Sequence, residues 1–259
     1  MLILRWLFLM TICTPAAIMA QRDVLEFTDP CRGDGFVRPH AVLREADVMW
    51  TRRVWRQIDL RDERNAPFAR PGGTRQPCRN LMSVIRHGLK DEGGITAYDP
   101  GPDGEDDAFR ARMSGTALSA VLAGIDTLGP DAVGRFMIKE DWLFDRSRSV
   151  MEARIIGLAP MIEVRGEFGE LRGFRPLFWL YYPECRQLFS WWNAAVGADG
   201  AGVTYEALLD GRHFAGEIVK VSNAHDRGID GSSTGLDALL ESEAIRKRLV
   251  DMGFDLWHY

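Results

Sequence analysis

The stretch Phe136–Pro160 reads FMIKEDWLFDRSRSVMEARIIGLAP and decides the fold class. Its first ten residues alternate in character, which is the spacing of a β-strand. The apolar set Phe136, Ile138, Trp142 and Phe144 alternates with Met137, Lys139, Asp141 and Asp145. The polar tetrapeptide Asp145–Arg148 is typical of a turn. It leads into a second expected strand, Val150–Pro160, so the middle of the chain predicts a pair of strands.

The sequence before this pair favours helices, because apolar residues recur there at intervals of three and four. The first expected helix begins near Ala41, the second follows Cys78 and ends at Gly93-Gly94, and the third begins near Ser114. Their apolar stripes are Leu43, Ala46, Trp50, Val54 and Ile58; then Cys78, Leu81, Met82, Ile85 and Leu89; then Leu118, Val121, Leu122, Ile125 and Leu128.

The sequence after the pair returns to helix by way of short strands. The run Leu177–Tyr182 is β-like in composition and is expected to end at Pro183. A short helix near Tyr205–Leu209, a strand near Phe214–Val221 and a last helix from about Leu236 to Met252 follow. This segregation predicts an α+β fold: a single domain with N-terminal helices, a central antiparallel-type sheet and a C-terminal helix.

The N-terminus is typical of an exported protein. Met1–Ala20 carries one basic residue, an apolar run and small residues near its end, so we expect a signal peptide cleaved before Gln21. The apolar run is too short to span a bilayer, and bulky Ile12 before Cys13 argues against lipid attachment. We expect an extended arm over residues 21–40 and the α+β domain over residues 41–259.

Composition narrows the class of partner and of site. The chain has 32 basic and 37 acidic residues and a net charge of −5, which argues against nucleic acid or an anionic membrane surface as a bulk partner. Cys31, Cys78 and Cys185 would survive cleavage, and an oxidising compartment permits one disulfide and leaves one thiol. The sequence does not choose the pair. The cysteines lie too far apart for a redox or zinc motif, so we predict no metal and no cofactor.

One motif favours an enzyme. Gly231–Gly235 reads GSSTG and fits the G-x-S-x-G pattern, with Ser233 as nucleophile and His225 or His258 as base. The preceding segment is polar and not a buried strand, so a loop that caps the last helix is the preferred interpretation. Glu140 and Asp141 are adjacent on a strand and would point to opposite faces, so they would not share a substrate. A non-enzymatic protein is therefore predicted, and a serine hydrolase stays the alternative.

Tryptophan and arginine favour a binding protein. Seven tryptophans follow the signal peptide, and arginines interleave with them in segments such as Arg52–Arg56. Both residue types are enriched at interface hot spots. Many of these rings are expected in the core, and a glycan-binding module built on exposed rings is a further alternative.

Four ordered blocks resemble the GldN/PorN family of the type IX secretion and gliding-motility apparatus. The blocks are ADVMWTRRVWRQIDLRDERNAPF (Ala46–Phe68), IKEDWLFDRSRSVMEARIIGLAP (Ile138–Pro160), FWLYYPECR (Phe178–Arg186) and ALLESEAIRKRLVDMGFDLWHY (Ala238–Tyr259). The resemblance implies a non-enzymatic periplasmic ring subunit. Its expected partners are an outer-membrane lipoprotein of the GldK/PorK type, the periplasmic part of a GldM/PorM-type motor and neighbouring copies of itself. The candidate contact residues are Trp55, Arg56, Arg61, Trp191 and Trp192.

Overall fold

The computed structural model describes residue 29 and residues 31–69, 78–90, 94–129, 132–196, 202–222 and 236–256. The expected signal peptide, residues 1–20, lies outside them. The elements in chain order are η1 (Glu45–Asp47), β1 (Val48–Asp59), η2 (Glu63–Asn65), α1 (Ala66–Ala69), α2 (Leu81–Lys90), β2 (Ala97–Tyr98), α3 (Gly115–Leu128), β3 (Val133–Asp145), β4 (Val150–Arg165), β5 (Leu171–Pro176), β6 (Trp179–Tyr181), α4 (Tyr182–Ser190), β7 (Asn193–Val196), β8 (Gly202–Thr204), α5 (Tyr205–Asp210), β9 (Glu217–Val221) and α6 (Leu236–Leu256).

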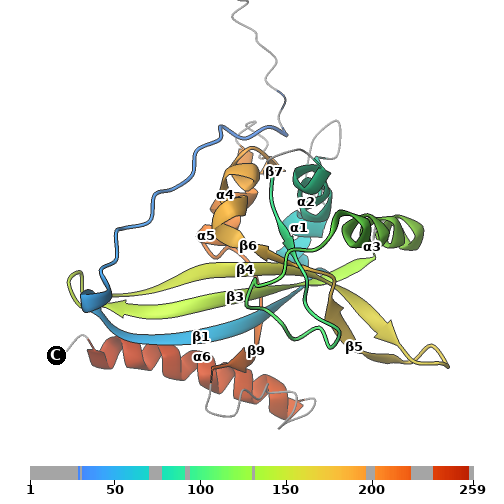
Figure 1. The fold of residues 1–259 in the computed structure, drawn as a ribbon. Helices are drawn as coiled ribbons and strands as arrows, with labels where there is room; N and C mark the ends of the chain where they lie inside the picture. Colours follow the sequence, from blue (N-terminus) through green and yellow to red (C-terminus); the bar gives the residue numbers. More distant parts are fainter. Residues whose placement is uncertain are drawn as a thin grey trace, which may run out of the picture.

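An antiparallel sheet of long and short strands forms the centre of the molecule (Figure 1). Its order is β2-β6-β4-β3-β1-β9, and β5 pairs with β4. The hairpin of β3 and β4 closes at Asp145↔Val150 and reaches past Phe136↔Pro160. The two strands expected in the middle of the sequence are confirmed, and so is the α+β fold with a C-terminal helix.

The helix expected from Ala41 to Ile58 is wrong, because Val48–Asp59 is the strand β1 between β3 and β9. Trp50, Val54 and Ile58 recur every four residues, and this spacing fits a strand of period two as well as a helix of period 3.6. β-branched and aromatic residues pack well on a pleated surface. Pairing with β3 along almost the whole of β1 therefore decided between the two structures.

The other helices that the sequence predicts are confirmed. α2, α3, α5 and α6 form where helices were expected, and Ser114 caps α3 by accepting from the Ala117 N–H. Leu128 does not point inward, since it is 67% exposed. Helix α4 was missed: Pro183 occupies its first turn, where the absent N–H is no loss, and so starts a helix after β6.

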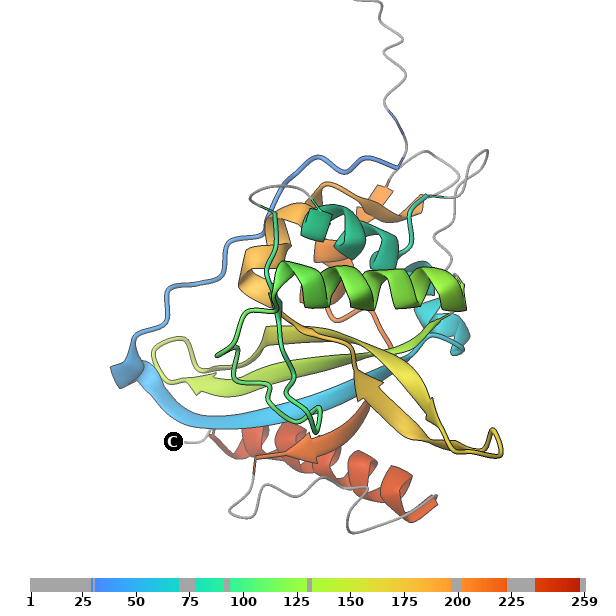
Figure 2. The ribbon, with the colours of Figure 1, turned by 45° about the vertical axis from the view of Figure 1, so that its right-hand side comes forward.

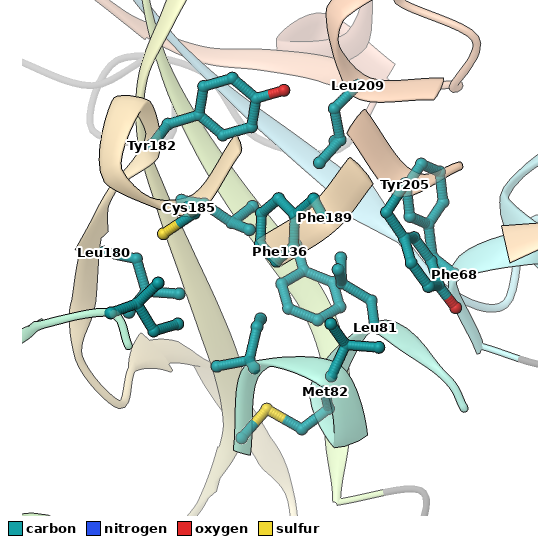
Figure 3. Packing of buried hydrophobic residues seen from close by; sticks show 14 of the residues in the cluster. Phe68, Leu81, Met82, Phe136, Leu180, Tyr182, Cys185, Phe189, Tyr205 and Leu209 are labelled. Carbon is teal, nitrogen blue, oxygen red and sulfur yellow. The ribbon is translucent and has the colours of Figure 1, made fainter. Parts of the chain in front are cut away.

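The main core lies between the sheet and the helices α1 to α5. Aromatic rings of Phe68, Phe136, Phe189 and Tyr205 meet aliphatic side chains of α2 there (Figure 3). Cys185 is also buried in this core, on the inner side of α4. A full core of this kind accounts for the helix positions, because each helix buries its apolar stripe against one face of the sheet.

The two faces of the sheet are covered differently. Residues of alternate positions, such as Ile58, Phe136 and Ile138, face the helices. A smaller cluster built on Val54, Ile218 and Leu249 joins β1 and β9 to α6, which runs along the edge of the sheet in Figure 2. The other face carries Trp55, Ala159 and Trp179, and the segment 99–113 crosses it. Among the described residues, no helix combines the length and apolarity that a bilayer crossing requires.

Candidate functional site

The N-terminal arm is an extended segment held on the outside of the helical layer. From Cys31 it runs past α4 and reaches η1 at the start of β1 (Figure 1). Gly33 and Gly35 make the first contacts: their N–H groups donate to the carbonyls of Trp191 and Ser190 over 3.1 and 3.2 Å. A Cβ on Gly33 would lie 2.2 Å from the Ser190 oxygen. Only glycine therefore lets the arm approach this closely.

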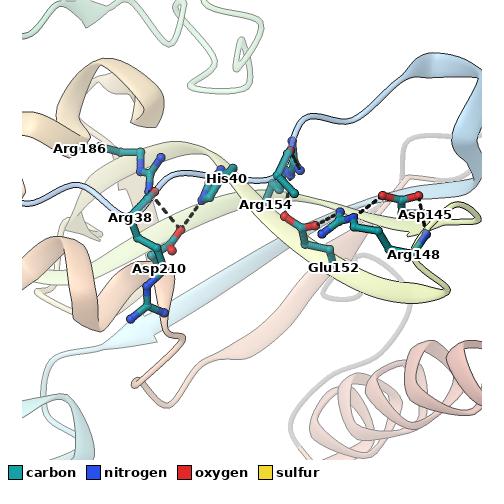
Figure 4. A network of polar contacts seen from close by, with 9 residues as sticks. Arg38, His40, Asp145, Arg148, Glu152, Arg154, Arg186 and Asp210 are labelled. Carbon is teal, nitrogen blue, oxygen red and sulfur yellow. Dashed lines mark hydrogen bonds and ion pairs between the residues drawn. The ribbon is translucent and has the colours of Figure 1, made fainter.

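Side chains of the domain hold the rest of the arm by its backbone (Figure 4). Arg186 of α4 donates to the carbonyl of Arg38, and Arg154 of β4 donates to the carbonyl of Ala41 over 2.8 Å. The imidazole of His40 lies 2.6 Å from the carboxylate of Asp210. The two arginine contacts use the arm's main chain and only His40 contributes a side chain to these three contacts, so most of the arm's side chains remain exposed.

A disulfide and a stacked tryptophan fix the beginning of the arm. Cys31 pairs with Cys78, just before α2, and Cys185 is the free cysteine among the described residues. Beside the disulfide, the Trp192 ring lies between two guanidinium groups, with Arg32 at 4.2 Å and Arg79 at 4.6 Å from its centroid. Cations over the face of tryptophan are stabilising. Trp192, one of the five candidate contact residues, is therefore 6% exposed and part of the arm's own anchor.

Exposed aromatic side chains gather where the arm leaves this anchor. Trp191 is 50% exposed and its indole packs over Gly35, while the next arm residue, Phe36, is 63% exposed. Phe36 and Val203 line a hollow of about 650 Å³ between the arm and β8, with Arg32 and Arg38 among its polar walls. Trp191 is thus the candidate tryptophan most accessible to a partner, and the sequence analysis missed its neighbour Phe36. The pattern RGDGF, with its two close glycines, was the available signal.

Trp55 lies on the face of the sheet opposite the helices. Its indole N–H donates to the carboxylate of Asp107 over 2.5 Å, and Lys139 binds the same carboxylate over 2.9 Å. The Lys220 ammonium lies 4.7 Å from the Trp55 ring. Trp55 is 7% exposed, so its ring helps to attach the segment 99–113 to the sheet.

Arg56 points to the helical side and joins a buried charge cluster. Glu140, fully buried, accepts two hydrogen bonds from Arg212 over 2.9 and 3.0 Å and one from the Trp142 indole over 2.9 Å. Arg56 lies 3.7 Å from the same carboxylate and donates to the Gly216 carbonyl. Burial lowers the pKa of the Arg56 guanidinium, and Glu140 opposes that shift. Removal of one charged side chain from this largely buried cluster would leave an opposite charge without its partner.

Arg61 is exposed at the end of β1, where it pairs with Asp59 over 2.7 Å. Its hydrogen bonds hold the pKa of Asp59 down at about 2, and Arg135 contributes. The structure therefore separates the five candidate residues. Trp191 and Trp192 share the arm anchor, whereas Trp55, Arg56 and Arg61 lie on β1 and just beyond it.

The residues of the alternative serine-hydrolase site are Ser233, His225 and His258. They lie outside the residues that the structure describes. In the part of the chain that the structure describes, no three His, Cys, Asp or Glu side chains are grouped to hold a metal ion. Cys185 is buried and its thiol donates to the Tyr181 carbonyl over 3.4 Å; burial raises the pKa of this thiol. A thiol with a raised pKa is a poor nucleophile.

The chain was compared with known proteins. A family model described as "Gliding motility associated protein GldN" matches residues 43–258, which is most of the chain. The match contains the first three blocks quoted above in full and all but the last residue of the fourth. No curated protein matches the chain.

Proposed function

Because the chain belongs to the GldN family, a family of gliding-motility and type IX secretion components, we propose that it is a structural ring subunit of that apparatus. It works in the periplasm at the inner face of the outer membrane. There it binds an outer-membrane lipoprotein of the GldK/PorK type and neighbouring copies of itself. The periplasmic part of a GldM/PorM-type motor engages the assembled ring.

The observation that carries this proposal is the arm with its anchor. An extended segment that binds its own domain through the main chain leaves its side chains free for another protein. Trp191 and Phe36 are aromatic, exposed and held by the glycine contacts and the disulfide. Rigid aromatic side chains make effective contact residues, because little conformational freedom is lost when they are buried by a partner.

The Cys31–Cys78 disulfide supports a periplasmic location, because disulfides persist in oxidising compartments. It also ties the arm to the domain during assembly. In this proposal the lipoprotein holds the subunit at the membrane. We assign the lipoprotein contact to the surface around Phe36 and Trp191.

The test is co-expression of the mature protein with a lipoprotein of the GldK/PorK type, followed by size-exclusion chromatography with light scattering. We expect a shared complex far larger than either protein alone. The double variant Phe36→Ser/Trp191→Ser should bind the lipoprotein at least tenfold more weakly, because two apolar contacts are lost. Leu128→Ser, at an exposed apolar position of α3, is the matched control. A monomer that ignores the lipoprotein would contradict the proposal, and an intact complex with the double variant would move the contact elsewhere.

A further inference from the structure

The open face of the sheet holds a pocket of about 370 Å³. Met137 and Met161, from neighbouring strands, form its apolar floor together with Phe174 of β5. Trp55 and Trp179 also line it. Thioether and aromatic groups of this kind adapt to many apolar side chains. No helix covers this face among the described residues, and only the segment 99–113 crosses it (Figure 2).

The pocket has two acidic side chains available to a cation. Asp103 and Glu105 are exposed, line the pocket and have no ion-pair partner among the described residues. Arg175 and Lys220 also line the pocket, so Asp103 and Glu105 are the groups that would pair with an incoming cation.

A buried donor also lacks an acceptor in this pocket. Trp179 is 2% exposed, and its indole N–H has no hydrogen-bond partner in the described part of the chain. Buried N–H groups are normally satisfied. A main-chain carbonyl of a docked segment is the kind of group that would accept this hydrogen bond.

The arm of the same protein carries the complementary groups. Val42 is 91% exposed, and Arg44 is exposed with no ion-pair partner in the described residues. Residues two apart in an extended segment project to the same side, and the arm is extended up to Arg44. An apolar side chain and a cation therefore stand together on one side of an extended segment.

The arm cannot reach the pocket of its own chain. It ends beside Val48, which pairs with Asp145, whereas the pocket lies near Gln57, which pairs with Met137. Nine residues of strand separate the two places, roughly 30 Å at the rise of a β-strand. Figures 1 and 2 both place η1 and the β4–β5 hairpin at opposite ends of the sheet.

We propose that Val42–Arg44 of one copy docks in the Met137/Met161 pocket of the next copy, with Val42 on the apolar floor and Arg44 against Asp103 and Glu105. The two surfaces differ and lie at opposite ends of the sheet, so the contact is head-to-tail. A head-to-tail contact continues from copy to copy and closes only as a ring. This inference rests on the proposed self-association of the subunit and names the surfaces that would make it.

The test exchanges the charges in the full complex with the lipoprotein. Arg44→Glu and Glu105→Arg should each weaken association between subunits about tenfold, since like charges then meet. The double variant Arg44→Glu/Glu105→Arg restores an opposite pair and should recover to within about threefold of the native protein. Lys247→Glu, at an exposed position of α6, is the control for a surface charge reversal and should change nothing.

Crosslinking gives an independent readout. An Arg44→Cys protein mixed with an Asp103→Cys protein should form a disulfide-linked dimer of the two, and neither should dimerise to the same extent alone. Absence of both the charge rescue and the mixed dimer would overturn the docking. The proposed function would survive that result if the lipoprotein still eluted with the subunit, and would fall separately if it did not.

Discussion

Lys139 and Glu140 are successive residues of β3, and they show how differently the two faces of the sheet are built. Both are charged and buried, with exposures of 3% and 0%. Glu140 faces the helices and is enclosed by Arg56, Arg212 and Trp142, which come from separate parts of the chain. Lys139 faces the open side, where its ammonium binds the carboxylate and the carbonyl of Asp107.

This difference means that one face mainly stabilises the fold, whereas the other is accessible to a partner. Glu140 and Arg56 keep only 0% and 9% of their side chains exposed, so a change to either leaves buried charge behind. Asp107 keeps 21% of its side chain exposed, and water can replace Lys139 as its partner. The helical face therefore contributes most to the free energy of unfolding. The open face keeps the pocket that a partner can enter.

Among the substitutions proposed, Glu140→Ala should lower the free energy of unfolding most. It leaves the buried Arg56 and the partly exposed Arg212 without their carboxylate, and removal of one partner of a buried ion pair costs about 3–5 kcal/mol. Urea denaturation at neutral pH measures the loss. Glu140→Gln keeps an acceptor for Arg212 and should lose less. A loss below about 1 kcal/mol for Glu140→Ala would contradict the closed cluster.

The double substitution Cys31→Ser/Cys78→Ser tests how much the disulfide between the arm and the domain contributes to the free energy of unfolding. Loss of a crosslink across a separation of 47 residues should lower the free energy of unfolding by about 2–4 kcal/mol, because the unfolded chain gains freedom. Reduction of the native protein should reproduce the effect in the same urea titration. Equal stability with and without reductant would show that the arm contributes nothing to folding.

Lys139→Met should have a smaller effect than Glu140→Ala. Methionine fills nearly the same volume, and the freed Asp107 carboxylate can turn to water, so we expect a change of about 1–2 kcal/mol. Thermal and urea unfolding measured beside Glu140→Ala give the comparison directly. A loss equal to that of Glu140→Ala would mean that the open face is as closed to water as the helical one.

The contribution of Asp59 to the free energy of unfolding should depend on pH. Its folded pKa is about 2, below the ordinary value near 3.9, because Arg61 and Arg135 favour the carboxylate. A depressed pKa gives stability that is present above about pH 4 and is lost as the pH falls through 2. Asp59 is 31% exposed, so the contribution is at most about 1 kcal/mol after screening by water. The difference between native and Asp59→Asn stabilities should shrink over this window. A difference that did not change with pH would contradict it.

The site was less predictable from sequence than the fold. The five candidate contact residues were chosen for residue type, and type alone does not report burial. Trp55, Arg56 and Trp192 are aromatic or basic, as contact residues often are, yet each is used inside the chain by Asp107, Glu140 and a pair of arginines. Phe36 and Val42 are neither tryptophan nor arginine, and their exposure in the structure distinguishes them.

The sequence by itself determined what depends on local periodicity. The alternation around Ile138, the turn at Asp145–Arg148 and the apolar stripes of α2 and α3 each follow from neighbours within a few residues. Tertiary structure decided the rest. A spacing of four at Trp50, Val54 and Ile58 suits both helix and strand, and pairing with β3 selected the strand. The Cys31–Cys78 pair likewise depends on where the arm lies, because a disulfide forms between cysteines that the fold brings together.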